Sequence, residues 1–409
     1  MDIESSTTES RRGIAEAQVI LKPRKARPFF GRHPWVLDSA VDHVDGQPGD
    51  GAVVDLIAHN GKFVARGIYN SQSRIRVRLY TWSAGDALDQ DFWRTKIERA
   101  VDFRRRLGYD QVDGAARLVY SEADGLSGLI VDRYGQHLVM QVTSLAMQSR
   151  VDEILPILGE ISGARGIVVR ADKTLARLEG LAKDEERTWG AVPDGPVFVT
   201  EHGLRYGVEI GLGQKTGFYL DQRENRRAVA AYMRGARVLD LFCYTGGFSL
   251  AASRLGDAAE VLGIDSSDKA VALARAGAEL NSVTNARFET ADGFDALDSL
   301  VSDRERFDVV ILDPPKFTRT RRSVEDALRA YHRINRLGAS LLPPGGILVT
   351  CSCSGSVTRE DFLYMLAGVS QQLGREIQVI EQRGAAPDHP ISTTCLETEY
   401  LKCFVCRVL

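Results

Sequence analysis

Residues 236–252, ARVLDLFCYTGGFSLAA, run from a β-branched apolar segment through a glycine pair into an alanine-rich segment. This pattern predicts a strand, a tight turn and a helix. Glycine permits the turn, and the N–H groups at the start of the helix can bind a polar ligand. The turn is not G-x-G-x-x-G, so the sequence disfavours a dinucleotide pyrophosphate as that ligand.

The same alternation continues on the C-terminal side of this unit. Strands are expected over 259–267, 286–292, 307–315 and 345–353, with helices over 248–256, 268–281 and 324–342. Alternating strands and helices predict an α/β fold with a mostly parallel, Rossmann-like sheet covered on both faces. Ligands of such sheets bind at the carboxyl ends of the strands. We therefore expect the catalytic domain to span 201–409.

Three expected strands carry an aspartate at or near the carboxyl end: Asp240, Asp265 and Asp292. Asp265 lies nineteen residues after Gly246, where a carboxylate can accept from both hydroxyls of a ribose. Asp292 could accept from an adenine amino group, with Phe294 beside it. Such an aspartate can also be no more than a helix cap. Three on successive strands favour an adenosine-type cofactor.

The N-terminal half has a different pattern. Residues 1–18 are polar and predict a disordered tail. Residues 19–88 carry short strands (19–23, 51–58, 61–69 and 74–82) separated by the turns GQPGDG and HNG, and so predict a small β-barrel. A helix over 89–107 opens a central α/β domain and linker, 89–200. Several domains also agree with a length of 409 residues.

Charge is unevenly distributed. The chain has a formal net charge of −3, whereas residues 22–81 hold ten Lys or Arg against five Asp, a local net of about +5. Arg74, Arg76 and Arg78 share one face of an expected strand. That face is either a solvated strand surface or a surface that follows nucleic-acid phosphates.

Asp313, Pro314, Pro315, Lys316 and Phe317 directly follow a buried strand. Two prolines fix φ and remove two N–H donors, so the loop is rigid and its carbonyls can accept from a planar base. Phe317 could stack on that base. The next strand ends in Cys351-Ser352-Cys353-Ser354, which places a thiol at the same rim of the sheet as Asp313.

Residues 236–354 resemble class I S-adenosylmethionine methyltransferases. The strings YTGGFS, DPPKF and SCS resemble the ribosomal large-subunit cytosine-C5 methyltransferase family, as do GRHPWVL (31–37), GQKTGFYLDQREN (213–225) and DHP (388–390). The resemblance covers nearly the whole chain after residue 19. It implies an N-terminal PUA domain, a small central α/β domain, a Rossmann-like catalytic domain and a ribosomal RNA substrate.

The resemblance also implies the cofactor site. S-adenosyl-L-methionine would bind with Asp265 on the ribose, Asp292 on the adenine and the 240–247 turn at the methionine end, covered by Lys215–Arg223. The expected cofactor contacts are Asp240, Phe242, Tyr244, Thr245, Gly246, Gly247, Asp265, Ser266, Asp292, Gly293 and Asp313. Pro314, Pro315, Lys316 and Phe317 are the expected substrate contacts.

The expected chemistry is thiolate addition. Cytosine C5 is a poor nucleophile, and a thiolate added to C6 makes C5 reactive toward the methyl group. Cys351 and Cys353 are two residues apart and would share a face of a continuing strand, so the residues alone do not choose between them. The family pattern Ser-Cys-Ser selects Cys353 as nucleophile and leaves Cys351 as packing. Asp313 would hold the pyrimidine at N3 or N4.

Other features have plainer interpretations. Cys403 and Cys406 form a C-x-x-C, but the surrounding residues alternate like a strand, so no metal site is expected. Free thiols in a reducing, cytoplasmic compartment are the simpler account. No apolar run approaches the roughly 18 residues of a membrane span. The oligomeric state is open and compatible with a homodimer.

Further basic residues follow the Asp-Pro-Pro loop: Arg319, Arg321, Arg322, Arg329, Arg333 and Arg336. They form either a solvated surface or a grip on an RNA backbone. His389 is either a pocket residue or a satisfied loop histidine.

Two rival functions remain. One is methylation of an exocyclic amine or another position of an RNA base, which needs no thiol. The other is a non-catalytic RNA-binding assembly factor.

Overall fold

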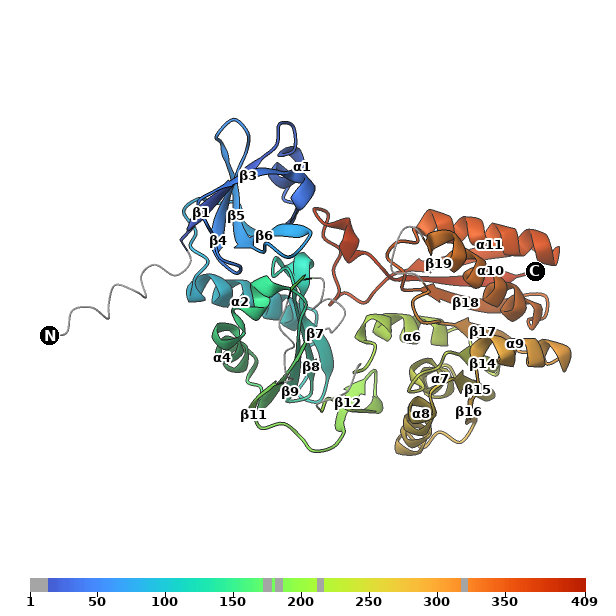
Figure 1. Cartoon of the computed structure of the whole chain (residues 1–409). Helices are drawn as coiled ribbons and strands as arrows, with labels where there is room; N and C mark the ends of the chain where they lie inside the picture. Colours follow the sequence, from blue (N-terminus) through green and yellow to red (C-terminus); the bar gives the residue numbers. More distant parts are fainter. Residues whose placement is uncertain (1–13, 172–178, 181–186, 212–216, 318–322) are drawn as a thin grey trace. The chain divides into compact units, whose positions relative to one another are not determined.

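The computed structural model describes residues 14–171, 179–180, 187–211, 217–317 and 323–409, which form two compact units (Figure 1). Unit 1 comprises the chain up to residue 197 together with 209–217 and 388–398. Unit 2 comprises 198–208, 218–387 and 399–409. Most of the expected tail lies outside the described residues. The finer division at 88 and 200 stays a prediction, and the return of 388–398 to unit 1 has no mark in the sequence.

Unit 1 begins with a six-stranded, mostly antiparallel sheet in the order β2-β6-β5-β4-β1-β3. Alternate residues of β1, β4 and β6, such as Val19, Leu56 and Leu79, form its core. The sequence missed β2 and β3, because β2 has three residues and β3 is largely polar. The elements are β1 Ala17–Leu21, α1 Arg27–Phe30, β2 Trp35–Leu37, β3 Val41–Asp45, β4 Val53–Ile57, β5 Phe63–Tyr69 and β6 Ile75–Thr81.

Glycine at position 67 allows β5 and β6 to approach closely. A Cβ there would lie 2.2 Å from the carbonyl oxygen of Arg78, and the strand register shifts between Arg66 and Gly67. Such a bulge increases the local twist of a strand pair. Any side chain at this position would push the two strands apart.

The three arginines of β6 and its approach do not share one free face. Arg78 is buried, and its guanidinium pairs with Glu179 at 3.0 Å and with Glu122 at 3.4 Å. Arg76 donates to the carbonyl oxygen of Asn70, and Arg74 is exposed. Both interpretations of these residues as one surface are therefore wrong for Arg78, because acidic groups beyond the barrel neutralise its charge.

The central part of unit 1 is a five-stranded sheet in the order β11-β10-β9-β8-β7 with helices α2 and α4. Helix α2 begins where the sequence predicts, because the Asp89 carboxylate accepts from the Phe92 N–H at 3.0 Å. The elements are α2 Gln90–Arg106, β7 Ala115–Tyr120, β8 Leu129–Tyr134, β9 His137–Val142, α3 Leu145–Gln148, α4 Val151–Ser162, β10 Gly166–Ala171 and β11 Arg187–Gly190.

A buried arginine attaches the returning segment 388–398 to unit 1. The Arg104 guanidinium donates to the Asp124 carboxylate and to the carbonyl oxygen of Asp388, both at 2.7 Å. The Arg117 N–H donates to the Asp388 carboxylate at 2.9 Å. Charge-assisted hydrogen bonds of this kind are about twice as strong as neutral ones. Arg104 thus fixes the segment although it is distant in sequence.

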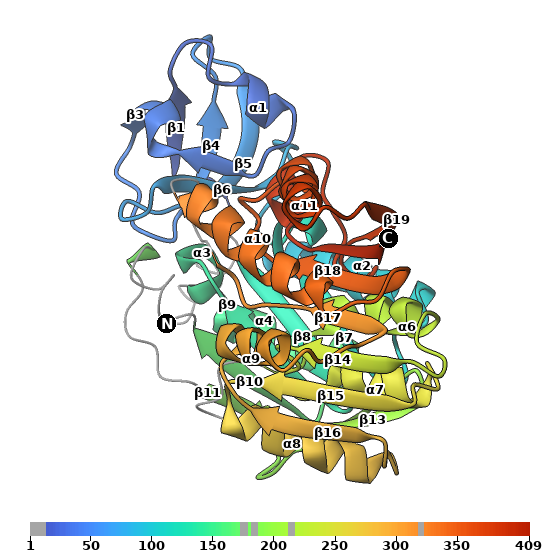
Figure 2. The same cartoon turned by 90° about the vertical axis from the view of Figure 1, so that its right-hand side faces the viewer.

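Unit 2 is a seven-stranded sheet in the order β16-β15-β14-β17-β18-β20-β19 (Figure 2). The first five strands are parallel, and β20 is antiparallel to both its neighbours. The strands are β12 Val197–Glu201 and β13 Leu204–Val208, which form a separate hairpin, and β14 Arg237–Leu241, β15 Glu260–Asp265, β16 Ala286–Thr290, β17 Val309–Leu312, β18 Gly346–Ser352, β19 Ile377–Arg383 and β20 Lys402–Val408. The predicted α/β fold class and its five parallel strands are confirmed.

Helices cover both faces of this sheet. Leu239, Leu312 and Phe404 pack with α9, α10 and α11, whereas Val238 and Val349 pack with α6 and α7. Neighbouring strand residues therefore alternate between two cores, as expected for a sheet buried on both faces. The helices are α6 Arg223–Ala230, α7 Gly247–Arg254, α8 Asp268–Leu280, α9 Gly293–Ser302, α10 Val324–Ser340 and α11 Arg359–Leu373.

The order of the strands reverses next to β14. From β14 the chain proceeds outward to β15 and β16 and then returns to β17 on the other side of β14. Leu241 pairs with Leu312, so the turn after β14 and the loop after β17 leave the sheet side by side. Such a reversal is where open α/β sheets bind ligands.

Candidate active site

The turn after β14 has an unusual backbone. Phe242, Tyr244 and Gly246 have φ values of 66°, 49° and 79°, and two of these are not glycine. A non-glycine residue in this region costs roughly 1–3 kcal/mol and tends to mark a functional site. A Cβ on Gly246 would lie 3.1 Å from the Ala274 Cβ, so this position is crowded as well as left-handed. No side chain caps α7, which starts at Gly247, and its first N–H groups can serve a ligand.

Asp240 lies beneath this turn. It is fully buried, and its Oδ2 accepts the Ser249 hydroxyl at 2.6 Å. Its Oδ1 has no hydrogen-bond partner among the described residues. Burial raises the pKa of Asp240 to about 7. A buried carboxyl with an unpartnered oxygen suits a site that receives a positively charged ligand.

Two further aspartates are held by backbone N–H groups. Asp265, at the end of β15, accepts from Tyr244 and from Ser267, both at 2.9 Å, and so joins two loops. Asp292 caps α9 by accepting from Phe294 at 2.9 Å and Asp295 at 3.2 Å. The capping interpretation of Asp292 thus holds, and the exposed carboxylate remains accessible.

Glycine brings the β14 turn against the start of α9. A Cβ on Gly293 would lie 2.5 Å from the Phe242 ring. Thr245 is half-buried in the same turn, and Ser266 is exposed beside Asp265. Apart from Asp313, which follows β17, the expected cofactor residues thus lie at or just after the carboxyl ends of the neighbouring strands β14, β15 and β16.

Asp313 begins the loop after β17. Its Oδ2 accepts from the Gln222 amide at 3.0 Å, and Gln222 in turn accepts from Asn225 at 2.6 Å. Burial, followed by the negative charge of Asp221, raises the pKa of Asp313 to about 7. A carboxyl in this state can donate a proton near neutral pH as well as accept one.

The two cysteines at the end of β18 have different surroundings. Cys351 is fully buried, pairs with Cys403 on β20 and packs in the core under α6 and α7. Cys353 is half-buried, because β18 ends at Ser352. The strand does not continue to Cys353, so the shared strand face expected of a continuing strand does not form, and Cys353 as the nucleophile stays a prediction. Burial and then the carboxyl of Asp313 raise the pKa of Cys353 to about 12.

The loop 313–317 only partly matches its expected role. Pro314 is buried, whereas Pro315 and Lys316 are exposed. The Phe317 ring packs 4.8 Å from the Tyr331 ring and 6.1 Å from the Phe294 ring. Phe317 thus packs against the core around α9 and α10, and because its ring is only half-buried, its stacking on a base stays a prediction.

Sequence reasoning gave no role to two residues near the end of β18, Lys402 and Tyr400. Lys402 is buried at the start of β20, and its ammonium donates to the carbonyl oxygens of Ser354 at 2.7 Å and Tyr400 at 2.8 Å. Burial lowers the pKa of Lys402 to about 8. The Tyr400 hydroxyl donates to Asp221 at 2.5 Å. The sequence signal that could have indicated Lys402 is a lysine at the start of an otherwise apolar strand.

Other predicted residues lie elsewhere or are neutralised. Arg333 pairs with Asp298 at 2.7 Å, and Arg329 pairs with Asp326, but both side chains are exposed, so a solvated surface and a grip on RNA both stay open on α10. Arg336 is half-buried on the same helix. His389 is buried in unit 1 against Asp388 and is a satisfied loop histidine. Lys215, Arg319, Arg321 and Arg322 lie outside the described residues.

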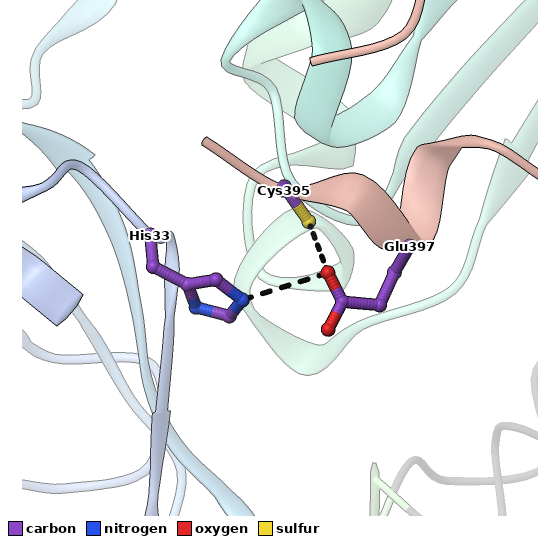
Figure 3. A group of neighbouring side chains, drawn as sticks. All are labelled: His33, Cys395 and Glu397. Atoms are coloured by element: carbon purple, nitrogen blue, oxygen red, sulfur yellow. Dashed lines mark hydrogen bonds and ion pairs between the residues drawn. The ribbon is translucent and has the colours of Figure 1, made fainter. Parts of the chain in front are cut away.

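Cysteine pairs do not form a metal site on β20, because Cys403 and Cys406 face opposite cores. Within the described ranges, one group has metal-like donors: His33, Cys395 and Glu397 in unit 1 (Figure 3). Glu397 lies 3.6 Å from the His33 Nε2 and 3.5 Å from the Cys395 sulfur. The Trp35 N–H donates to His33 Nδ1, so Nε2 carries the proton of the neutral ring. Within the trio, the Cys395 thiol donates a hydrogen bond to Glu397, and Glu397 lies within ion-pair distance of His33.

Comparison with known proteins agrees with this geometry. A family profile described as S-adenosylmethionine-dependent methyltransferase matches residues 177–393, and a PUA-like domain profile matches 19–82. The chain therefore belongs to the S-adenosylmethionine-dependent methyltransferase family. Its cofactor is S-adenosyl-L-methionine, as predicted, and the expected PUA-like domain is confirmed.

Individual relatives extend the match over the chain. It is 39% identical over 394 residues to ribosomal RNA large subunit methyltransferase I of Tolumonas auensis, covering 96% of this chain and 99% of the relative. It is 38% identical to the protein of the same name from Aeromonas hydrophila, with the same coverage. A solved structure, SMU.776, described as a putative methyltransferase complexed with SAH, shares the fold with a TM-score of 0.82 at 20% identity and covers 95% of this chain and 99% of its own. None of the described helices is long and apolar enough to cross a membrane.

Proposed function

We propose that this chain methylates C5 of a cytosine in large-subunit ribosomal RNA through a covalent bond between Cys353 and C6. The carrying observation is that Cys353, a half-buried thiol, lies within electrostatic range of the Asp313 carboxyl. Relatives named ribosomal RNA large subunit methyltransferase I support the substrate class. The cytoplasm as location and a homodimer as assembly belong to the same proposal.

The cofactor would occupy the three loops after β14, β15 and β16. The residues present fit it, because the strained β14 turn, the uncapped start of α7 and the unpartnered Asp240 oxygen are features that a ligand would explain. When bound, S-adenosylmethionine supplies an electrophilic methyl group on a positively charged sulfur. Asp265 would accept from the ribose, Asp292 from the adenine, and Phe242, Tyr244, Thr245, Gly246, Gly247, Ser266 and Gly293 would line the cradle.

Cys353 makes C5 of the base nucleophilic. Its thiolate forms a C–S bond at C6, and the electron pair of the C5=C6 double bond moves to C5. C5 would use this pair to form the new carbon–carbon bond to the methyl group, while the bond between the methyl group and the cofactor sulfur breaks and its electron pair stays on that sulfur. Loss of the C5 proton then restores the double bond while the C–S bond breaks, and the electron pair of that bond returns to sulfur. The thiolate is regenerated.

Asp313 assists the attack on C6. Its raised pKa lets the neutral carboxyl persist near pH 7, so it can donate to N3 of the cytosine. This hydrogen bond withdraws electron density from the ring and favours addition of the thiolate. Asp313 also borders the cofactor loops. Pro314, Pro315 and Lys316 would contact the base or its phosphate, and the base would have to leave its stack to reach the thiol.

The test uses RNA in which cytidine is replaced by 5-fluorocytidine. Fluorine cannot leave as a proton does, so the covalent complex should accumulate in wild type and in Cys351→Ala but not in Cys353→Ala. With ordinary RNA and labelled cofactor, nucleoside analysis should give 5-methylcytidine. Label on an exocyclic amine, with Cys353→Ala fully active, would establish the rival methyltransferase chemistry. Absence of cofactor binding would support the non-catalytic rival.

A further inference from the structure

The active site holds a carboxyl that the proposed chemistry does not use. Asp221 is 9% exposed, and its Oδ2 accepts the Tyr400 hydroxyl at 2.5 Å. Its Oδ1 is buried and has no hydrogen-bond partner among the described residues. Buried polar atoms are almost always partnered, and an exception requires a reason such as a catalytic role. The Tyr400 bond fixes the carboxylate in this unsatisfied position.

Asp221 acts on both reacting groups. Its negative charge contributes to the raised pKa of Asp313 and to that of Cys353. The next residue, Gln222, donates to Asp313 at 3.0 Å, so Asp221 and Asp313 are connected through adjacent backbone positions. Asp221 is therefore part of the electrostatic surroundings of the nucleophile.

Other charged groups do not cancel this effect. Cys353 interacts with the carboxyls of Asp313 and Asp221, with the hydroxyls of Tyr219 and Tyr331 and with the ammonium groups of Lys316 and Lys402. Lys316 is exposed to solvent, which screens its charge. The Lys402 ammonium is already bound by two carbonyl oxygens. Around Asp313 there are also Asp240 and Arg226, and Arg226 is paired with Glu201 at 2.8 Å.

We propose that Asp221, held by Tyr400, is a positioning residue that keeps Cys353 as a thiol until a cationic ligand enters. The inference rests on the proposed function, in which Cys353 is the nucleophile. A fixed negative charge opposes the formation of further negative charge in a buried site, and a positive ligand charge offsets it. Asp221 thereby couples formation of the thiolate to cofactor binding.

The reactivity of Cys353 toward iodoacetamide tests this proposal without RNA. The full chain is alkylated between pH 6.5 and 9, and peptide mass spectrometry follows each cysteine separately. The other five thiols are buried, so Cys353 should react first. Asp221→Asn removes one negative charge, and each unit of lowered thiol pKa raises the thiolate fraction about tenfold. We expect Asp221→Asn to react roughly tenfold faster than wild type at every pH below the thiol pKa.

Two control variants distinguish an effect of charge on Cys353 reactivity from an effect of loosened packing. Tyr400→Phe breaks the same hydrogen bond but keeps the carboxylate, so Cys353 should stay slow. Glu381 is a second carboxylate that accepts a tyrosine hydroxyl, from Tyr232, at 2.5 Å. Glu381→Gln should leave the alkylation rate of Cys353 unchanged. If Asp221→Asn and Tyr400→Phe accelerated the alkylation of Cys353 equally, only the access of iodoacetamide to the thiol would have changed, and the proposal would be overturned.

The ligand provides the last comparison. S-adenosylmethionine and S-adenosylhomocysteine differ by a methyl group and one positive charge. Alkylation of wild type should be faster with the former, and this ratio should fall toward one in Asp221→Asn. An identical ratio in both proteins would contradict the coupling. Methylation by Cys353→Ala decides the proposed function independently, so failure of one proposal is distinguishable from failure of the other.

Discussion

Along the carboxyl edge of the unit 2 sheet, acidic side chains on one side have hydrogen-bond donors for their oxygens, whereas those on the other side lack some of these donors. On the side proposed to bind the adenosine of the cofactor, Asp265 and Asp292 accept from two backbone N–H groups each. On the side proposed for the reaction, Asp221 has an oxygen without a hydrogen-bond partner among the described residues, and Asp313 has its pKa raised to about 7. Hydrogen bonds from the backbone thus stabilise negative charge on the first side but not at Asp221. The proposal therefore predicts that cofactor affinity and catalytic rate depend on different parts of this edge.

The largest expected effect comes from Asp313→Asn. The amide cannot donate a carboxyl proton, and a positioned acid typically contributes 10²–10⁴-fold, so kcat should fall by about 10³-fold with a small change in cofactor affinity. Steady-state methylation and calorimetric cofactor titration measure the two quantities.

Asp292→Asn is the same substitution on the side proposed to bind the adenosine, and it is compared with Asp313→Asn. Asparagine caps a helix as well as aspartate, so folding should be retained. We expect weaker cofactor binding with kcat within about threefold of wild type. A thousandfold loss of kcat in this variant would contradict the proposal that cofactor binding and catalysis depend on different parts of the edge.

The second effect concerns pH. The pKa of Asp240 is raised from 3.8 to about 7, so between these values the folded protein binds a proton that the unfolded chain releases. Stability should therefore fall as pH rises toward 7 and level off above it. Between pH 5 and 7 the contribution is about 1–3 kcal/mol. Asp313 adds a slope of the same sign, because its pKa is also raised to about 7. Asp240→Asn should therefore reduce the pH dependence of the unfolding midpoint in urea without abolishing it, and an unchanged slope would argue against a buried proton on Asp240.

The smallest effect compares two glycines. Gly246 and Gly235 both have left-handed φ values, but a Cβ would be crowded at Gly246 and would meet nothing within 4 Å at Gly235. Both alanine variants should lose about 1 kcal/mol from backbone strain. Gly246→Ala should lose roughly 1 kcal/mol more and also bind cofactor more weakly. Equal losses in urea unfolding would show that the β14 turn tolerates the extra atom.

Periodic segments made most of the unit 2 fold predictable. Strands such as β14 and β17 are apolar runs bounded by turn residues, and α8 and α10 show helical spacing, so local sequence carries the signal. Acidic residues at strand ends were equally visible. Contacts between residues distant in sequence could not be predicted. The hydrogen bond from Tyr400 to Asp221 joins residues 179 positions apart, and neither side chain is unusual in its local context.

The errors have specific causes. The shared face of Cys351 and Cys353 assumed that β18 continues, but it ends at Ser352. Arg78 was predicted from strand alternation, which says nothing of acidic residues in the next part of the chain.

The return of 388–398 to unit 1 has a consequence for synthesis of the protein. The buried Arg104 guanidinium needs the carbonyl oxygen of Asp388, which is translated 284 residues later. Domains usually fold in order as they emerge. Here the N-terminal unit cannot reach its final form until nearly the whole chain has left the ribosome, so premature termination near the C-terminus would damage the first-made part of the molecule as well as the last.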